Sequence, residues 1–120
     1  MFNLFARPAG QSRPVAEVVA EVAAGRMALI DVRETAEIRA SGLAKGAIHI
    51  PLGLIPTRTD PAAPDRPAAL ADGRPVALYC ASGGRSGRAA QIMRQLGYAE
   101  VVNIGGLGDW VAAGGQVVSA

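Results

Sequence analysis

Residues 75–86 read Pro75-Val76-Ala77-Leu78-Tyr79-Cys80-Ala81-Ser82-Gly83-Gly84-Arg85-Ser86. The first half is a short, continuous apolar run, which is typical of a strand that is buried on both faces of a parallel sheet. Two glycines follow, and the apolar residues after them recur at helical spacing until Gly97. The stretch therefore predicts a strand, a loop and a helix in succession, with Cys80 as the last residue of the strand.

The segments on either side repeat this alternation of strands and helices. Apolar runs predict further strands at residues 28–32, 47–50 and 101–104. Helical periodicity predicts helices from Pro14 to Gly25, with Ser12 as the N-cap, from Glu34 to Ala40, and from Leu107 to Ala113. The alternation indicates one α/β domain over residues 1–120, with a parallel sheet and helices on both of its faces.

Two connections are expected to lack regular structure. The proline-rich stretch from Leu52 to Pro67 predicts a loop, followed by a short helical turn at residues 68–70. The pair Gly105-Gly106 predicts a turn between the last strand and the last helix.

Composition narrows the possible functions. The chain has 120 residues, half of them hydrophobic, and its twelve cationic residues are scattered for a net charge of +2, which argues against a nucleic-acid-binding face. One cysteine excludes an internal disulfide, and one cysteine with one histidine leaves no convincing set of metal ligands. We expect no metal and no external cofactor.

The amino-terminal residues 1–8 lack a signal-peptide pattern, and no apolar run is long enough for a membrane helix. We therefore expect a cytoplasmic protein that does not bind membranes.

The surroundings of Cys80 suit a reactive thiolate. In open parallel sheets ligands bind beyond the carboxyl ends of the strands, where Cys80 is expected to lie. The glycines let backbone N–H groups converge on an anion, and the following helix adds the positive end of its dipole. A thiol at a helix amino terminus and beside Arg85 has a lowered pKa, and the thiolate is the nucleophile.

The ordered set of motifs along the chain resembles the rhodanese family. The stretch Cys80–Ser86 is similar to that family's active-site loop, and Asp31-Val32-Arg33-Glu34 is similar to its "DVRE" strand end. Residues 46–52 (GAIHIPL) resemble its "GAINIPL" segment, and residues 103–117, with Gly105-Gly106, Trp110 and Ala113-Gly114-Gly115-Gln116-Val117, resemble its "GG…W…AGxPV" ending. Together the matches span residues 28–118.

The resemblance implies a doubly wound α/β domain with a mostly parallel sheet of about five strands. It implies a sulfurtransferase that takes sulfane sulfur from a small-molecule donor such as thiosulfate and passes it to a thiophilic acceptor, such as cyanide, a small thiol or a protein thiol. By motif match Cys80 is the nucleophile that carries the persulfide. The substrate cradle would be Ala81, Ser82, Gly83, Gly84, Arg85 and Ser86. Within it, Arg85 would orient the loop or neutralise the anionic substrate.

Four residues outside the loop also have expected roles. We expect Asp31 and Arg33, at a strand end on the same edge as Cys80, to support the active-site loop rather than act in catalysis. His49 stands where the family often has Asn, and a hydrogen bond to the backbone is favoured over a role as a base. Core packing is favoured over substrate contact for Trp110.

Two other functions use a similar framework. A phosphatase or arsenate reductase of this fold also uses a cysteine loop that ends in arginine, but in the related phosphatases five residues separate the two, whereas here four do. The shorter loop is expected to crowd a tetrahedral phosphate. A non-catalytic binding module is the other alternative, and it is disfavoured because Cys80 is retained.

Overall fold

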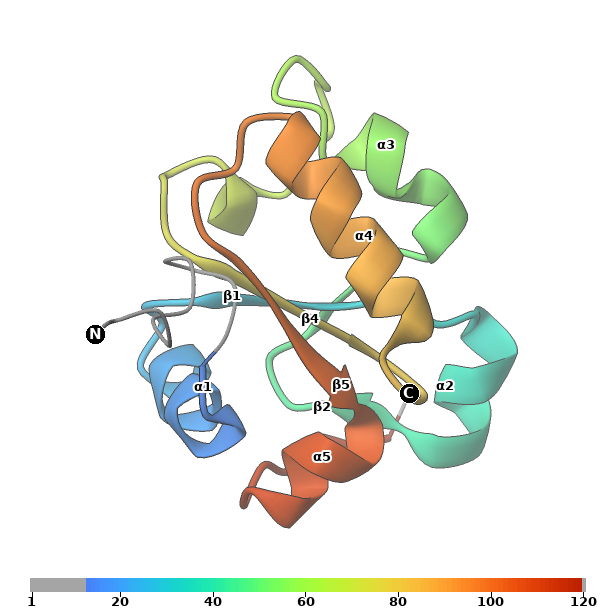
Figure 1. The fold of residues 1–120 in the computed structure, drawn as a ribbon. Helices are drawn as coiled ribbons and strands as arrows, with labels where there is room; N and C mark the ends of the chain where they lie inside the picture. The colour runs from blue at the N-terminus through green and yellow to red at the C-terminus, as the bar shows by residue number, and fades with distance from the viewer. Residues whose placement is uncertain (1–12, 120) are drawn as a thin grey trace, which may run out of the picture.

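The four segments predicted as strands form one parallel sheet. In the computed structural model, which describes residues 13–119, the sheet has the strand order β3-β1-β4-β5 (Figure 1). Its strands are β3 (Ile48–His49), β1 (Ala28–Asp31), β4 (Val76–Cys80) and β5 (Val101–Gly106), and each neighbouring pair is parallel. The α/β class is thus confirmed, with four strands in the main sheet rather than about five.

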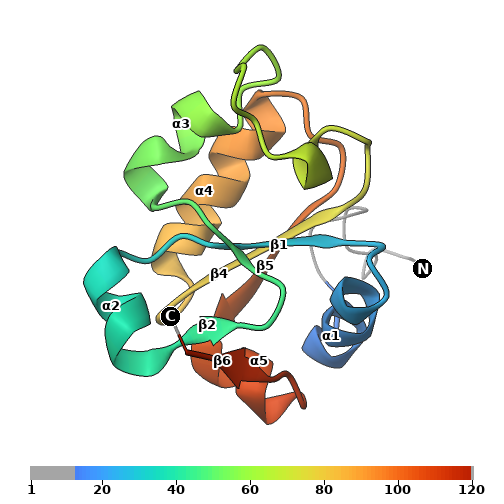
Figure 2. The same ribbon diagram turned by 180° about the vertical axis from the view of Figure 1, so that it is seen from behind.

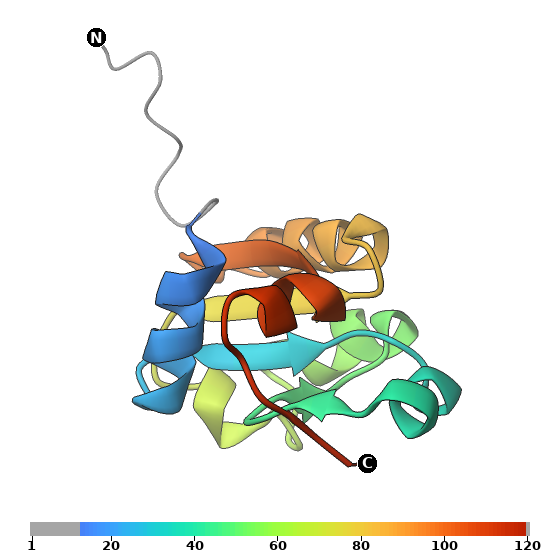
Figure 3. The same ribbon diagram turned by 90° about the horizontal axis from the view of Figure 1, so that it is seen from below.

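Both faces of the sheet are covered, as expected for strands that are mostly apolar. Along β4 all five residues are buried, and their side chains alternate between two apolar clusters. Helices α3 (Ile55–Arg58) and α4 (Gly84–Gln95) pack on the face that holds Cys80, whereas α1 (Val15–Ala23) and α5 (Leu107–Ala112) pack on the other. Figure 1 shows α3 and α4 above the strands and α1 and α5 below them, and Figure 3 shows the same layers with α5 in front.

The predicted helices α1, α2 and α4 are confirmed, with small changes at their ends. Helix α1 has Pro14 in the N-cap position, and the proposed cap Ser12 lies outside the described residues. Helix α2 (Thr35–Ser41) begins with reciprocal hydrogen bonds between Glu34 and Glu37, the arrangement of a capping box.

The connection after β3 differs from the expected loop. It contains a short 3₁₀ helix, η1 (Leu52–Leu54), followed directly by α3. Proline was the reason for expecting a loop, but Pro56 occupies the first turn of α3, where its missing N–H costs no hydrogen bond. The predicted helical turn at residues 68–70 is confirmed as η2 (Ala68–Leu70).

Two further elements were not predicted. Strands β2 (Leu43–Ala44) and β6 (Val117–Val118) form a separate antiparallel pair, which lies beside α5 in Figure 2. The pair Gly105-Gly106 does not form a turn, because it continues β5 up to the first residue of α5. Among residues 13–119, no helix is both long and apolar enough to cross a membrane.

Candidate active site

The strand order places the Cys80 loop at a switch point of the sheet. The chain passes from β1 outward to β3 and then returns to β4 on the other side of β1. At such a reversal the connections leave in opposite directions, which opens a crevice beyond the carboxyl ends of the two central strands. Asp31 ends β1 and Cys80 ends β4, so both lie at this edge of the sheet.

The sulfur of Cys80 is held by polar groups of its own loop. The backbone N–H of Gly83 donates to Sγ at 3.0 Å, and the hydroxyl of Ser86 lies 3.3 Å from the same atom. Cys80 is 1% exposed and Ser86 is fully buried, so these contacts are shielded from bulk water. Polar hydrogens aimed at a sulfur atom favour its charged form.

These contacts alter the acidity of the thiol. Burial opposes ionisation, but it is outweighed by hydrogen bonds from the Ser86 hydroxyl and from the backbone N–H groups of Ser86, Gly83 and Ser82. Together they lower the pKa of Cys80 from about 9 to about 7. A large fraction of the cysteine is therefore thiolate at neutral pH, which is the nucleophilic form.

The backbone after Cys80 turns sharply at a glycine before α4 begins. Gly83 has a φ of 108°, a left-handed conformation that favours glycine, and it turns the chain from β4 into α4. The N–H groups of Gly84 and Arg85 have no acceptor among the described residues, as is usual at the first turn of a helix. Backbone donors of this kind, beside a helix amino terminus, can bind an anion next to the sulfur.

Arg85 closes the loop through a partner that sequence reasoning did not find. Its Nη1 and Nη2 atoms donate to the two carboxylate oxygens of Glu37 at 2.7 and 2.8 Å. Hydrogen bonds from Arg85 and from the backbone N–H of Glu34 lower the pKa of Glu37 to about 2. The hydrogen bonds between Arg85 and Glu37 in turn raise the pKa of Arg85. The one sequence signal was the spacing of Glu34 and Glu37 at the start of a helix.

Asn103 is the second residue that was missed. Its side chain lies between the loop and the end of β5, where Oδ1 accepts from the Ser86 hydroxyl at 2.7 Å and from the Gly105 N–H at 3.0 Å. Its Nδ2 donates to the carbonyl of Gly83 at 2.9 Å. The available signal was a polar residue near the carboxyl end of a predicted strand, on the same sheet edge as Cys80.

Asp31 and Arg33, which were predicted to support the loop, bind to each other and to the end of α2. Asp31 and Arg33 form a buried ion pair at 2.8 Å, and Arg33 also donates to the Ser41 hydroxyl and to the Gly42 carbonyl. These contacts fasten the end of α2 to β1. The pair can support the loop through α2, whose Glu37 binds Arg85, and through Tyr79, whose ring lies 5.6 Å from the Arg33 guanidinium and which directly precedes Cys80.

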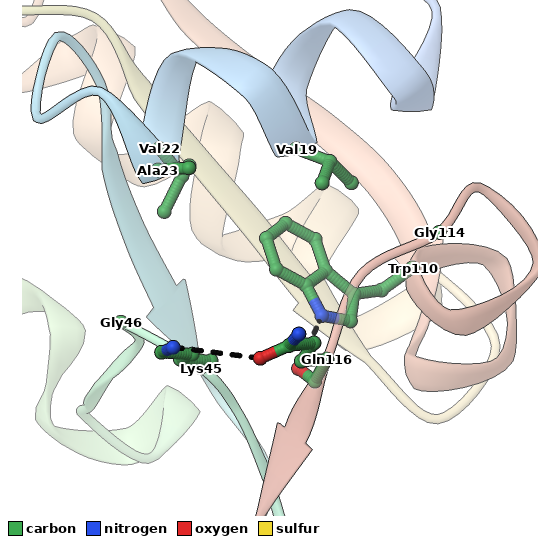
Figure 4. Close-up of a pocket in the computed structure, with 8 residues that line it drawn as sticks. All are labelled: Val19, Val22, Ala23, Lys45, Gly46, Trp110, Gly114 and Gln116. Carbon is green, nitrogen blue, oxygen red and sulfur yellow. Dashed lines mark hydrogen bonds between the residues drawn. The ribbon is translucent and has the colours of Figure 1, made fainter.

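His49 is a strand-end residue and Trp110 is a core residue, as expected. The Nε2 of His49 donates to the Arg33 carbonyl at 2.6 Å, which confirms the expected hydrogen bond to backbone. Trp110 is buried in the cluster on the opposite face of the sheet from Cys80, and its indole N–H donates to the Gln116 carbonyl, so the core role is confirmed. Its ring also lines a cavity of about 420 Å³ between α1 and the Lys45-Gly46 turn, which Figure 4 shows.

Comparisons with known proteins match most of the chain. The family model described as "Rhodanese-like domain" matches residues 14–113, which include the Cys80 loop. A sulfurtransferase of Allochromatium vinosum is 37% identical over 92 residues, which are 76% of this chain and 78% of that protein. The thiosulfate sulfurtransferase PspE of Escherichia coli is 38% identical over 80 residues, which are 67% of this chain and 70% of that protein.

A solved structure from Rhodopseudomonas palustris has a similar fold. It belongs to a protein of unknown function described as a possible tyrosine phosphatase. The two structures have a TM-score of 0.78 at 28% sequence identity, over 90% of this chain and 84% of the other.

Proposed function

This chain belongs to the rhodanese-like domain family, and from that premise we propose that it is a sulfurtransferase in which Cys80 carries sulfur as a persulfide. One observation carries the proposal. The Cys80 sulfur lies 3.0 Å from the Gly83 N–H and 3.3 Å from the Ser86 hydroxyl, in a loop that lowers its pKa to about 7. That setting supplies a thiolate and, next to it, donors for an anion.

Thiosulfate is the donor that we propose for the first half of the cycle. The Cys80 thiolate attacks the outer sulfur of thiosulfate, a sulfur–sulfur bond forms, and the bond to the sulfonate sulfur breaks with its electron pair. Sulfite leaves, and the negative charge of the thiolate passes to the outer sulfur of the persulfide. We propose that the N–H groups of Gly84 and Arg85, which have no acceptor among the described residues, bind the anionic donor and then that outer sulfur.

A thiophilic acceptor completes the cycle. Cyanide, or a thiolate on a small molecule or a protein, attacks the outer sulfur and forms the new bond to it, and Cys80 leaves as the thiolate. Each half is a displacement at sulfur, and covalent capture divides one transfer into two easier steps.

Because a free reactive thiol is best kept reduced, we place this activity in the cytoplasm.

The state of Arg85 favours sulfur transfer over phosphate chemistry. Both terminal nitrogens of Arg85 are bound to Glu37, so the fork of the guanidinium is not free to bind two oxygens of a phosphate. Four residues, Ala81 to Gly84, separate Cys80 from Arg85, which makes the loop short for a tetrahedral group. Arg85 instead contributes positive charge near the thiolate and holds α2 against the loop.

Steady-state turnover tests this proposal against phosphatase activity. We expect thiocyanate to form from thiosulfate and cyanide, with saturation in thiosulfate, and we expect an aryl phosphate to be hydrolysed no faster than in a protein-free control. The result that would overturn the proposal is the reverse: phosphate ester hydrolysis at a saturable site, with no thiocyanate formed.

A further inference from the structure

The amide of Asn103 has one orientation in this site. The Gly83 carbonyl can only accept a hydrogen bond, and it lies 2.9 Å from Nδ2, whereas the Gly105 N–H can only donate, and it lies 3.0 Å from Oδ1. The two backbone groups therefore hold the amide so that its oxygen faces Ser86. The distance from that oxygen to the Ser86 hydroxyl oxygen is 2.7 Å.

The Ser86 hydroxyl has more acceptors than it can serve. Its oxygen lies 2.7 Å from Asn103 Oδ1, 3.3 Å from the Cys80 sulfur and 3.4 Å from the Gly105 carbonyl. A hydroxyl carries one proton, so it donates to one of these groups at a time. Ser86 is fully buried, so the choice is made among protein groups rather than with bulk water.

We infer that Asn103 is a positioning residue that competes with the Cys80 sulfur for the single proton of Ser86. The inference rests on the proposed function, in which this sulfur ionises. In the thiol state the Cys80 S–H donates to the Ser86 oxygen, and the Ser86 O–H donates to Asn103. When the thiol loses its proton to solvent, the hydroxyl turns toward the sulfur and leaves the Asn103 Oδ1 atom with the Gly105 N–H as its one remaining donor.

The acceptor of the Ser86 hydroxyl changes as the negative charge moves between the inner and outer sulfur atoms during the cycle. In the persulfide the negative charge lies on the outer sulfur, so the inner sulfur of Cys80 is a weak acceptor and the hydroxyl returns to Asn103. Asn103 thus favours the two states in which the inner sulfur is uncharged, and it restrains the free thiolate. A residue with this effect sets how much of the resting protein is thiolate and how readily the persulfide discharges.

The other charged and titratable groups around the loop come from five elements. They are Arg85 on α4, Glu34 and Glu37 beside and on α2, Asp109 on α5, which accepts from the Gly106 N–H, and His49 with the Asp31–Arg33 pair at the ends of β3 and β1. The variants below leave all of these groups in place, so their contribution is common to each comparison.

The test is the rate of Cys80 alkylation by iodoacetamide as a function of pH. The chain has one cysteine, so the titration reports this thiol alone and needs no sulfur donor. In the native protein we expect the rate to rise with a midpoint near the lowered pKa of about 7. Asn103→Leu, which removes the competing acceptor, should lower the midpoint by about one unit, because the hydrogen bond to the thiolate strengthens.

Two further variants separate competition from support of the loop. Asn103→Asp keeps the acceptor for Ser86, loses the donor to Gly83 and adds charge, so it should raise the midpoint. Ser86→Ala should also raise it, and in that background Asn103→Leu should have no effect on the midpoint. If Asn103→Leu does not fold, the rise caused by Asn103→Asp should still shrink in the Ser86→Ala background.

Results of two kinds would overturn the inference. In one, the Leu and Asp substitutions at position 103 shift the midpoint in the same direction, which is what the shared loss of the Gly83 contact would do. In the other, the effect of either substitution is undiminished without the Ser86 hydroxyl. Failure of sulfur transfer would leave these titrations unchanged, so the inference and the proposed function can fail separately.

Discussion

Replacing Cys80 with serine is expected to reduce thiocyanate formation by about 10³-fold or more, to the rate without protein. The reason is chemical: a serine hydroxyl stays protonated at neutral pH, and it cannot form the sulfur–sulfur bond of a persulfide. The chain contains no second cysteine that could take over the transfer. Steady-state turnover of the native protein and of Cys80→Ser, with the same donor and acceptor, measures this effect.

The fold is the control for this substitution. A serine oxygen at position 80 can still accept from the Gly83 N–H and from Ser86, so the buried loop keeps its hydrogen bonds. We expect the melting temperature to change by no more than about 5 °C. Residual turnover above a tenth of the native rate, in a folded variant, would show that Cys80 is not the sulfur carrier.

Gly106→Ala is expected to lower both stability and turnover, although Gly106 is outside the proposed substrate cradle of residues 81–86. A Cβ atom at this position would lie 2.0 Å from the carbonyl oxygen of Ala81 and 2.7 Å from its carbonyl carbon. These are backbone atoms of the active-site loop, so no side-chain rotation relieves the clash. Either the loop or the end of β5 must move, which costs about 3 kcal/mol and lowers the melting temperature by about 10 °C.

Turnover should fall with the displaced loop. A shift of about 1 Å in a reacting group commonly costs about 10²-fold in rate, and we expect a loss of that size for thiosulfate turnover of Gly106→Ala. Gly108→Ala is the matched control, because nothing lies within 4 Å of a Cβ there and the residue is in α5. That variant should keep native turnover and be unchanged in stability or more stable by up to about 1 kcal/mol. Equal effects at positions 106 and 108 would contradict the account.

The parts of the fold that depend on local pattern could be predicted from the sequence. The apolar run of β4 and the periodic residues of α4 are both continuous in the chain, and together they place Cys80 at the edge where ligands bind. The loop between them has the glycine at the position that needs a left-handed conformation, Gly83. For these reasons the strand, the loop and the helix around the candidate nucleophile were all correctly expected.

What could not be predicted depends on contacts between distant residues. Strands β2 and β6 have two residues each, too few for a period to show, and they pair across most of the chain. The partner of Arg85 is 48 residues away on α2, and Asn103 reaches Ser86 only because β5 lies beside β4. In each case the residue types were ordinary, and only the sheet order brought them to the loop.

The two missed residues change how the site works. From the sequence, Arg85 was expected either to orient the loop or to neutralise an anionic substrate, and in the structure Glu37 occupies its fork and ties α2 to the loop. The sequence also placed Asn103 in a strand without a role, whereas in the structure its amide contacts Ser86, Gly83 and Gly105 together. The loop that holds the sulfur is therefore hydrogen-bonded to α2 on one side and to β5 on the other.

The intact mass of the protein after incubation with thiosulfate shows whether Cys80 holds a sulfur atom. We expect the native chain to gain the mass of one sulfur atom, cyanide to remove that sulfur with release of thiocyanate, and Cys80→Ser to gain nothing. An unchanged mass in the native chain under conditions of measurable turnover, or the same gain in Cys80→Ser, would contradict the claim that Cys80 carries sulfur as a persulfide.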